Sequence, residues 1–365
     1  MTEHGYRALP KAIIHGIGTV NPEKWMYQKD ILELFLSHDG FHTVASETKK
    51  RNDFLRAVYA GSKIQKRYIA APKFTIRGDD IGEAMHQVGK IGLPLTVEAS
   101  KRAMKEAGVE TNDIKKLIFV TCTGLIAPGI ESMLITELGL ARDTPRVNLV
   151  FMGCAAAITA LTTAKDFCLA NPEEKCLVVC LELFTFHTGH DEGNAMAVYM
   201  SLFGDGCAAV VLSGEYENNA KGKWAIEGNY SYMIPDCPNA LTMSLMEKGL
   251  AGTLDVKVPS IIQKNMKEFM EGYYSKFGIN EVDHWCIHPG GPAILKAVQA
   301  ALGITDDQLE HSWECLKQYG NMSSATVCFI LDRMRKFKET KKNDTMIMMA
   351  FGPGLWVESL FLVKQ

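Results

Sequence analysis

Residues 146–170 read RVNLVFMGCAAAITALTTAKDFCLA. The apolar run at 146–152 is typical of a buried strand, and 155–170 has the composition and spacing of a helix. Gly153 and Cys154 stand between the two, so the sulfur is expected at or near a helix N-terminus. Free backbone N–H groups and the helix dipole favour an anion there, which makes Cys154 a candidate thiolate nucleophile. This segment alone leaves open a packed cysteine at a strand–helix junction.

The same alternation of strand and helix patterns continues along the chain. Apolar runs typical of strands covered on both faces occupy 116–121, 175–183, 207–212, 284–287, 345–350 and 355–363. Helical patterns occupy 95–108 and 292–303, and the second of these opens with proline and closes with glycine. Alternating strands and helices predict an α/β architecture.

The two halves of the chain share one sequence pattern. In each half a helical pattern that ends in glycine leads into a strand, which stops at Thr123-Gly124 in the first half and at His288-Pro289-Gly290-Gly291 in the second. We interpret this as a duplicated α/β unit, with residues 1–220 carrying the cysteine and 221–365 carrying the histidine. The polar stretch 213–223 is the expected junction.

Composition excludes several classes of function. The chain has 365 residues, a net charge of −3 and 47% hydrophobic residues, so no electrostatic feature indicates a nucleic acid or an anionic membrane as partner. No run reaches the ~18 uninterrupted apolar residues that a membrane span needs, and the first residues lack a secretory pattern. The 10 cysteines include no C-x-x-C pair, which is typical of reduced cysteines. We expect a soluble, cytoplasmic protein.

Two further residues could take part in chemistry with Cys154. His288 ends an apolar strand before a glycine-rich loop, where an imidazole can reach a cavity. Asn321 lies in a turn of small polar residues, from which its amide could face a ligand oxygen. Taken singly, each has a simpler interpretation: a hydrogen-bonded loop histidine, and a helix N-cap asparagine.

Few features of the sequence indicate a metal site or a dinucleotide-binding site. His187 and His190 lie beside two carboxylates, but no H-E-x-x-H pattern or cysteine pair accompanies them, so we expect no metal. The segment Gly352-Pro353-Gly354 does not fit G-x-G-x-x-G, and no helical pattern follows it. We predict a rigid bend that lines a cavity.

Together and in this order, several motifs of the chain are similar to those of the type III polyketide synthases of the thiolase superfamily. The matching segments are 17–22 (IGTVNP), 64–68 (IQKRY), 150–157 (VFMGCAAA), 202–206 (LFGDG), 286–295 (CIHPGGPAIL), 320–324 (GNMSS) and 351–354 (FGPG). The resemblance covers nearly the whole chain and implies a thiolase-like layered αβαβα fold built from two related halves. It also implies a homodimer that works without metal or redox cofactor.

The resemblance implies a mechanism for three residues. Cys154 and His288 would form a thiolate–imidazolium pair, and Cys154 would hold an acyl group taken from an acyl-CoA. His288 and Asn321 would stabilise the enolate formed when malonyl-CoA loses carbon dioxide. Repeated condensation and cyclisation would then give a polyketide. An acyl carrier protein is a further candidate donor of the starter.

Substrate preference follows from cavity positions. Phe203 matches the aromatic gate of the family, and Ser323 with Gly352, Pro353 and Gly354 matches cavity-wall positions. Gly252 lies at or near the position of the family's second gatekeeping aromatic residue. A glycine there is expected to open the wall of the cavity. The segment after Cys154 is most similar to bacterial and fungal members. We therefore expect a fatty acyl starter and an alkylpyrone, alkylresorcinol or phloroglucinol-type product.

Two family features are matched only in part. Among the CoA-binding positions, Arg56 and Ala293 are the nearest matches, whereas Ala57 and Gly61 stand in place of cations. Ala127 replaces the methionine that family members insert into the partner subunit.

Three alternatives to an iterative synthase remain at this stage. The nearest is a ketoacyl synthase that performs a single condensation. The others are an acyltransferase or binding protein that keeps the fold without condensing, and a metal-dependent hydrolase that uses His187 and His190.

Overall fold

The computed structural model describes residues 9–37, 45–71, 81–187, 194–216, 220–246 and 249–365. Its strands are β1 (Lys11–Val20), β2 (Trp25–Tyr27), β3 (Lys66–Tyr68), β4 (Ile114–Thr121), β5 (Arg146–Val150), β6 (Lys175–Leu183), β7 (Asp205–Glu215), β8 (Trp224–Met233), β9 (Ser244–Met246), β10 (Gly249–Ala251), β11 (His284–Ile287), β12 (Thr345–Gly352) and β13 (Trp356–Lys364). Its helices are α1 (Gln28–Leu36), α2 (Ala45–Gly61), α3 (Ile81–Ala107), α4 (Ile130–Leu138), α5 (Ala156–Ala170), α6 (Asn194–Leu202), α7 (Val258–Phe277), α8 (Pro292–Leu302), α9 (Glu310–Tyr319) and α10 (Ser324–Phe337).

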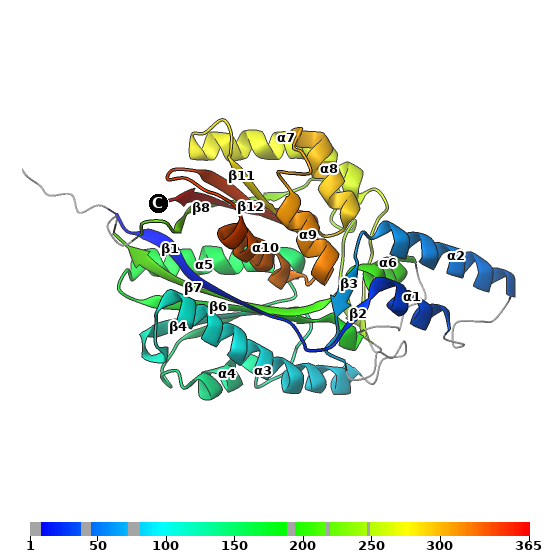
Figure 1. The fold of residues 1–365 in the computed structure, drawn as a ribbon, viewed down its shortest axis with the longest axis horizontal. Helices are drawn as coiled ribbons and strands as arrows, with labels where there is room; N and C mark the ends of the chain where they lie inside the picture. The colour runs from blue at the N-terminus through cyan, green and yellow to red at the C-terminus, as the bar shows by residue number, and fades with distance from the viewer. Residues whose placement is uncertain (1–8, 38–44, 72–80, 188–193, 217–219, 247–248) are drawn as a thin grey trace, which may run out of the picture.

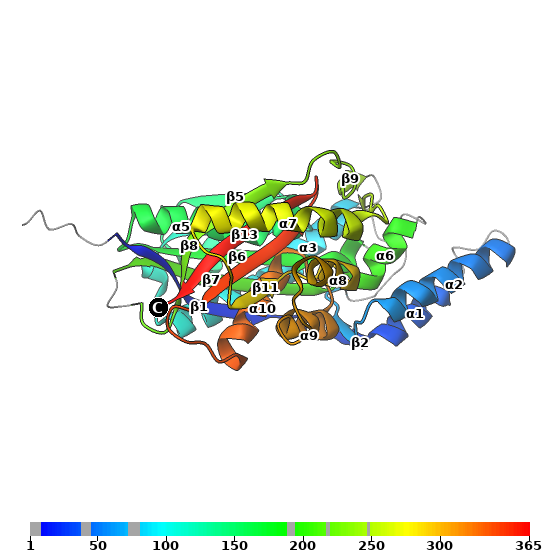
Figure 2. The same ribbon diagram turned by 90° about the horizontal axis from the view of Figure 1, so that it is seen from above.

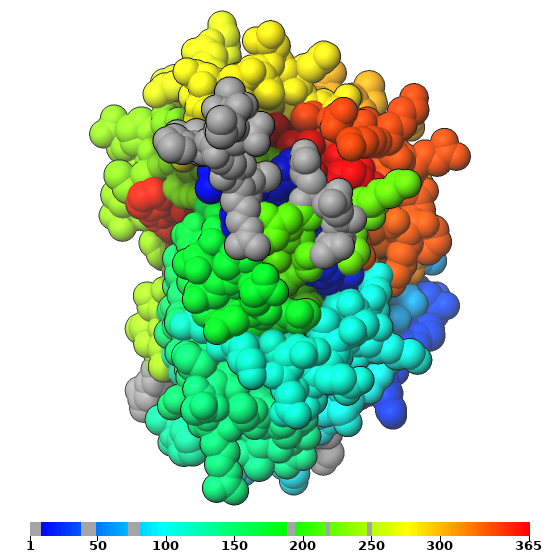
Figure 3. Space-filling model, turned by 90° about the vertical axis from the view of Figure 1, so that its left-hand side faces the viewer, coloured from blue at the N-terminus to red at the C-terminus, as the bar shows by residue number. Residues whose placement is uncertain are grey.

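Five layers alternate through the molecule (Figure 1). One continuous sheet has the strand order β11-β12-β13-β8-β1-β7-β6-β4-β5. Strands β1 and β8 pair only over Ala12–Ile14, and beyond this junction the two portions of the sheet separate around α5 and α10. Helices α7 and α8 cover one outer face, and α3 and α4 cover the other. In the space-filling view the yellow surface of the α7 segment lies at the top, and the cyan surface of the α3 segment lies in the lower half (Figure 3). The predicted αβαβα layering is confirmed.

Small side chains build the central layer. Helix α5 buries alanines 156, 157, 160 and 164 between the two portions of the sheet, and α10 is buried along most of its length. Alanine lets backbones approach closely while giving up little helix propensity. This packing places the N-terminal ends of α5 and α10 close to one another, as the contact between Cys154 and Asn321 described below shows.

A cap of helices lies outside the layered body. Helices α1 and α2 project to one side of it (Figure 2) and pack against α6 through a cluster that includes Ile31, Phe35, Tyr59 and Met200. This cap was not predicted from the sequence.

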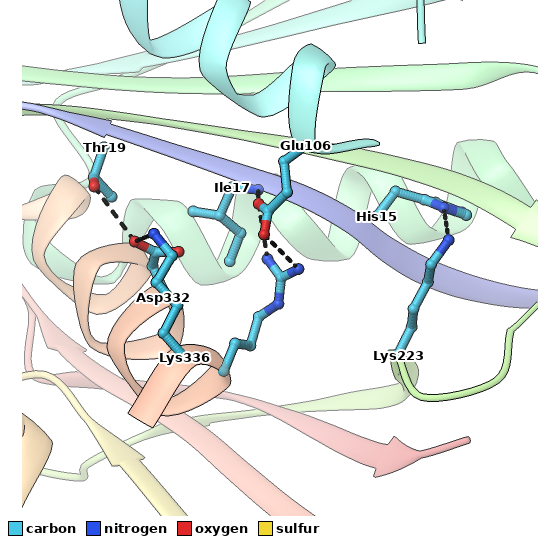
Figure 4. Close-up of polar contacts among 8 residues, drawn as sticks. His15, Ile17, Thr19, Glu106, Lys223, Asp332 and Lys336 are labelled. Atoms are coloured by element: carbon cyan, nitrogen blue, oxygen red, sulfur yellow. Dashed lines mark hydrogen bonds and ion pairs between the residues drawn. The ribbon is translucent and has the colours of Figure 1, made fainter. Parts of the chain in front are cut away.

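A polar seam joins the N-terminal and C-terminal portions on one side of β1 (Figure 4). Glu106 of α3 accepts a hydrogen bond of 2.6 Å from the backbone N–H of Ile17 and also contacts Arg335 of α10. Asp332 of α10 contacts Thr19 at 3.5 Å and Lys336 at 2.8 Å. The seam therefore ties β1 to helices from both halves.

Two predictions about elements were wrong. The run at 146–152 is not a strand covered on both faces: β5 is an edge strand, and Val150 and Met152 keep about two fifths of their surface exposed, 44% and 40%. Helix α3 begins at Ile81, well before the predicted 95, and Pro94 lies inside it. Strands β1 and β8 were not predicted.

Candidate active site

The elbow that carries Cys154, the candidate nucleophile, requires glycine at position 153. Gly153 has φ +68°, and a Cβ there would lie 2.3 Å from Cδ of Pro353. The tight 3-10 turn Gly153–Ala155 then leads directly into α5, so Cys154 does lie at a helix N-terminus, as predicted. The backbone N–H of Gly153 donates to Sγ of Cys122 at 3.2 Å, which fixes the elbow from the other side.

Asn321 presents its amide to the sulfur. Both amide heavy atoms, Oδ1 and Nδ2, lie 3.9 Å from Sγ of Cys154. Nδ2 donates to the carbonyl of Gly290 at 3.1 Å, and Oδ1 accepts from the backbone N–H of Ser323 at 2.7 Å. The N-cap of α10 is Ser323 and not Asn321, so the simpler interpretation of Asn321 as a helix cap does not hold.

His288 lies at the end of β11, two residues before the Gly290 carbonyl that Asn321 contacts. Its side chain is completely buried, and neither ring nitrogen has a hydrogen-bond partner among the described residues. Burial lowers the pKa of His288 to about 3, so the imidazole is neutral at physiological pH. A buried imidazole with both nitrogens unpaired is suited to accept or donate a proton to a bound ligand.

The surroundings of Cys154 favour its thiol form. Although Cys154 keeps some exposed surface, burial raises its pKa to about 11, and the charge of Glu182 acts in the same direction. The Ser323 hydroxyl and the Asn321 amide oppose this rise. To act as a nucleophile, Cys154 would therefore need a proton acceptor.

Glu182 belongs to the site and was missed in the sequence. Its carboxylate is completely buried at the end of β6 and accepts hydrogen bonds from Cys122, Thr123 and Ser324. Burial raises its pKa to about 7. The carboxylate inside the otherwise apolar run 176–183 (CLVVCLEL) was the available signal, because buried carboxylates are rare without a specific role.

Phe203 borders an apolar cavity beside the reaction centre. Its ring stacks on Phe184 with 4.0 Å between centroids. The two residues that flank Phe203 hold the backbone of Asn321: the Leu202 carbonyl accepts from the Asn321 N–H, and the Gly204 N–H donates to the Asn321 carbonyl. The cavity is lined by Arg67, Phe184, Thr185, His187, Met196, Tyr199, Met200, Phe203, Met243, Leu250 and Ala251. Gly252 is not among these residues. A Cβ at Gly252 would lie 2.1 Å from the Thr242 carbonyl, so this glycine permits a close backbone approach and does not widen the wall.

A second, largely apolar groove includes Gly290 among its lining residues. Its walls come from α2, the N-terminus of α7 and the N-terminus of α8, where Ala293 lies. Arg56 does not line this groove, and it pairs with Glu33 at 3.7 Å on the exposed surface of the cap. Of the two CoA-binding candidates, the structure therefore brings only Ala293 to the groove.

The Gly352-Pro353-Gly354 bend lies against the elbow. Gly352 and Pro353 line a surface cleft together with Met152, Ala155 and Trp356, and the N–H of Gly354 donates to Leu241. The bend therefore supports the turn before Cys154 through the contact of Pro353 with Gly153.

The histidines proposed for the metal alternative are only partly described. His187 is buried and contacts the Thr123 carbonyl at 2.8 Å through Nε2, and His190 lies outside the described residues. Within the described ranges, no cluster of three His, Cys, Asp or Glu residues is arranged to hold a metal ion. Among the described residues, no helix combines the length and the apolar composition of a membrane span.

Comparisons with known protein families match both halves of the chain. The family described as chalcone and stilbene synthases, N-terminal domain, matches residues 2–215, and the corresponding C-terminal domain matches residues 226–364. Among curated proteins, the alpha-pyrone synthesis polyketide synthase-like Pks18 of Mycobacterium tuberculosis is 32% identical, over 96% of this chain and 90% of that protein. Probable polyketide synthase 1 of Dictyostelium discoideum is 30% identical over 98% of this chain, which corresponds to 12% of that longer protein.

Solved structures agree with this relationship. PKS-I of the brown alga Ectocarpus siliculosus superposes with a TM-score of 0.92 at 30% identity, covering 99% of this chain and 100% of that one. The C-terminal type III polyketide synthase domain of Steely1 from Dictyostelium superposes with a TM-score of 0.86 at 29% identity, covering 97% and 99%.

Proposed function

This chain belongs to the chalcone and stilbene synthase family of type III polyketide synthases, and from that membership we propose the reaction it performs. It condenses malonyl-CoA repeatedly, with loss of carbon dioxide, onto an acyl starter held on Cys154, and the product cyclises. The observation that supports this proposal most directly is the Asn321 amide, which contacts both the Cys154 sulfur and the loop that follows His288.

Loading of the starter needs a proton acceptor beside the thiol. The neutral, unpaired imidazole of His288 is the group in this loop that can take the Cys154 proton. The sulfur then attacks the acyl-CoA carbonyl, a thioester to Cys154 forms, and CoA leaves as its thiol.

Condensation places negative charge on the malonyl thioester oxygen. When the carbon–carbon bond to the carboxylate breaks, carbon dioxide leaves and its electron pair forms an enolate. Nδ2 of Asn321 and the ring N–H of the neutral His288 would donate hydrogen bonds to that oxygen. The enolate carbon attacks the acyl group on Cys154 and releases the sulfur, which extends the chain by two carbons. Because His288 and Asn321 are both buried, little water is available to protonate the carbanion first.

We propose a fatty acyl starter and an alkylpyrone, alkylresorcinol or phloroglucinol-type product. The apolar side chains behind Phe203 support an aliphatic tail, and a related protein is described as acting in alpha-pyrone synthesis. The apolar groove at Ala293 suits a pantetheine arm, which CoA and an acyl carrier protein share.

We also propose a homodimer that works in the cytoplasm. The free edge of β5, with Val150 and Met152 exposed, is a surface that a second copy would cover. All 10 cysteines are free, as expected in a reducing compartment.

Product analysis tests the proposal. The protein is incubated with malonyl-CoA and a series of acyl-CoAs from hexanoyl to palmitoyl, with coumaroyl-CoA as the aromatic comparison, and products are identified by mass spectrometry. We expect fatty acyl starters to be extended more than once and released as cyclic products. Cys154→Ala should abolish product, while a substitution of the buried Cys168 on α5, Cys168→Ala, should retain it. A product extended only once would indicate a ketoacyl synthase of the initiating type.

A further inference from the structure

Arg67 is the buried arginine of the motif 64–68 (IQKRY), which has no part in the chemistry proposed above. Only 2% of the residue is exposed, and no ion pair with a carboxylate involves it among the described residues. A guanidinium that is taken out of water without an anion is costly unless its donors find acceptors. The place of those acceptors therefore indicates what Arg67 does.

The acceptors lie at the C-terminal end of α6. Nη1 of Arg67 donates to the backbone carbonyls of Met200 and Phe203 at 2.7 and 2.6 Å. Nε of Arg67 donates to Oε1 of Gln28 at 2.9 Å, and Nε2 of Gln28 in turn donates to the carbonyl of Ser201 at 2.7 Å. The last carbonyls of a helix have no partner within the helix, and a cation beside them complements the helix dipole. Arg67 and Gln28 therefore hold the end of α6.

The same end of α6 holds the loop that carries Asn321. The carbonyl of Leu202 accepts from the N–H of Asn321 at 2.8 Å, and the N–H of Gly204 donates to the carbonyl of Asn321 at 2.9 Å. The stem of Arg67 also packs on this loop, because a Cβ on Gly320 would lie 3.0 Å from its Cγ and Cδ. The four consecutive carbonyls 200–203 are thus bound by Arg67, Gln28 or Asn321, so a shift of the helix end would move the backbone of Asn321.

We propose that Arg67 is a positioning residue for condensation: by holding the end of α6, it keeps the Asn321 amide in place beside the Cys154 sulfur. Nδ2 of Asn321 lies 3.9 Å from Sγ of Cys154, so the amide must be held accurately to reach an enolate oxygen formed there. A misplacement of ~1 Å can cost about 100-fold in rate. This inference rests on the proposed function, in which Asn321 donates to the enolate.

A double-mutant cycle tests the inference. Malonyl-CoA decarboxylation is measured in the wild type, Arg67→Met, Asn321→Ala and the double variant, and loading of Cys154 is followed separately as the mass of the acyl-enzyme. Arg67→Met should slow decarboxylation about 10- to 100-fold and leave loading near the wild-type level. In the Asn321→Ala background it should add little, because the group that Arg67 positions is already absent. Arg67→Lys keeps a cation at the helix end and should recover part of the rate.

Arg102→Met is the matched control. Nη1 of Arg102 also donates to a backbone carbonyl, that of Thr19 on β1 at 2.9 Å, but this carbonyl is not on α6. The control should change neither decarboxylation nor loading. Two results would overturn the inference: equal losses from Arg67→Met with and without the Asn321 amide, or loading that falls in parallel with decarboxylation. Either result would show a general structural effect that does not act through Asn321.

A milder variant decides the question if circular dichroism shows that Arg67→Met is unfolded. Gln28→Met removes one acceptor of Arg67 and the contact with Ser201. It should slow decarboxylation by a smaller factor, again with loading preserved and with little further loss in the Asn321→Ala background. Losses that add in that background would contradict the inference.

Hydrogen exchange separates this inference from the proposed function. In Arg67→Met, the N–H groups of Asn321 and Gly204 should exchange about tenfold faster than in the wild type, while those of β6 should not change. Faster exchange at these two groups in a protein that makes no polyketide would support the positioning role and reject the synthase. Polyketide formation with unchanged exchange in Arg67→Met would do the reverse.

Discussion

Gly153 and Pro353 lie in direct contact, so that a Cβ on Gly153 would be 2.3 Å from Cδ of the proline. The residue before the nucleophile belongs to the N-terminal half, and the proline belongs to the turn between β12 and β13 of the C-terminal half. The position of the sulfur therefore depends on how the two halves pack.

We expect Gly153→Ala to destabilise the protein by about 2–4 kcal/mol, because it adds a clash with Pro353 to the strain of a positive φ. Gly108→Ala is a matched control: Gly108 has φ +67°, almost the same as Gly153, but nothing lies within 4 Å of its Cβ position. The control should cost only about 1 kcal/mol. Urea denaturation of both variants measures the difference, and equal losses would contradict the role of the contact.

Asn321→Ala should separate loading from condensation. Removing the amide takes away one donor to the enolate oxygen, so malonyl decarboxylation and chain extension should fall by about 100- to 1,000-fold. Loading of Cys154, which does not form that enolate, should persist and is measured as the mass of the acyl-enzyme. Asn265→Ala on α7, where the amide contacts only its own helix through the carbonyl of Ile261, is the control. Loss of loading in Asn321→Ala would contradict the assigned role.

We expect substitutions of Glu106 and Arg335, two partners in the polar seam, to lower the free energy of unfolding by different amounts. Glu106→Ala leaves the buried N–H of Ile17 without its acceptor and should cost about 1–3 kcal/mol. Arg335→Ala removes only a partly exposed ion pair and should cost less than about 1 kcal/mol. Chemical denaturation distinguishes the two, and an arginine variant as unstable as the glutamate variant would show that the ion pair is the main stabilising contact.

His15 should make the protein sensitive to acid. Lys223 donates to Nδ1 of His15 and Ser213 contacts Nε2 (Figure 4 shows the lysine contact), so a second proton has no place on the ring. Burial, with Lys223 second, lowers the pKa of His15 from 6.5 to about 4. A lowered pKa means that the stability contribution is complete above pH 6.5 and is lost as pH falls through about 4.

The measurement is the difference in unfolding free energy between the wild type and His15→Gln as a function of pH. Glutamine does not titrate, so the variant should lose less stability between pH 6.5 and 4. The raised pKa of Glu182 acts oppositely, favouring the fold as pH falls from about 7 towards 4.5, but it is common to both proteins and cancels. Parallel curves would show that His15 does not titrate in this range.

Local patterns predicted much of the scaffold. The runs at 175–183 and 284–287 are β6 and β11, and the proline and glycine at 292 and 303 bound α8. Buried strands and capped helices can be recognised from a few consecutive residues, because burial and backbone geometry restrict the amino-acid composition locally. The edge position of β5 was not visible, since its exposure depends on which strand is its neighbour.

Local patterns and motifs were enough to predict the layered α/β architecture, the turn that brings Cys154 to a helix N-terminus, and three candidate residues for the chemistry. The protonation preferences could not be predicted from the sequence, because desolvation depends on side chains that arrive from β6, β11 and α10. The tertiary structure showed that burial favours a thiol at Cys154 and a neutral imidazole at His288, and that it raises the pKa of Glu182. It also showed that Gly252 accommodates the backbone of Thr242, a contact between residues that no local pattern reports.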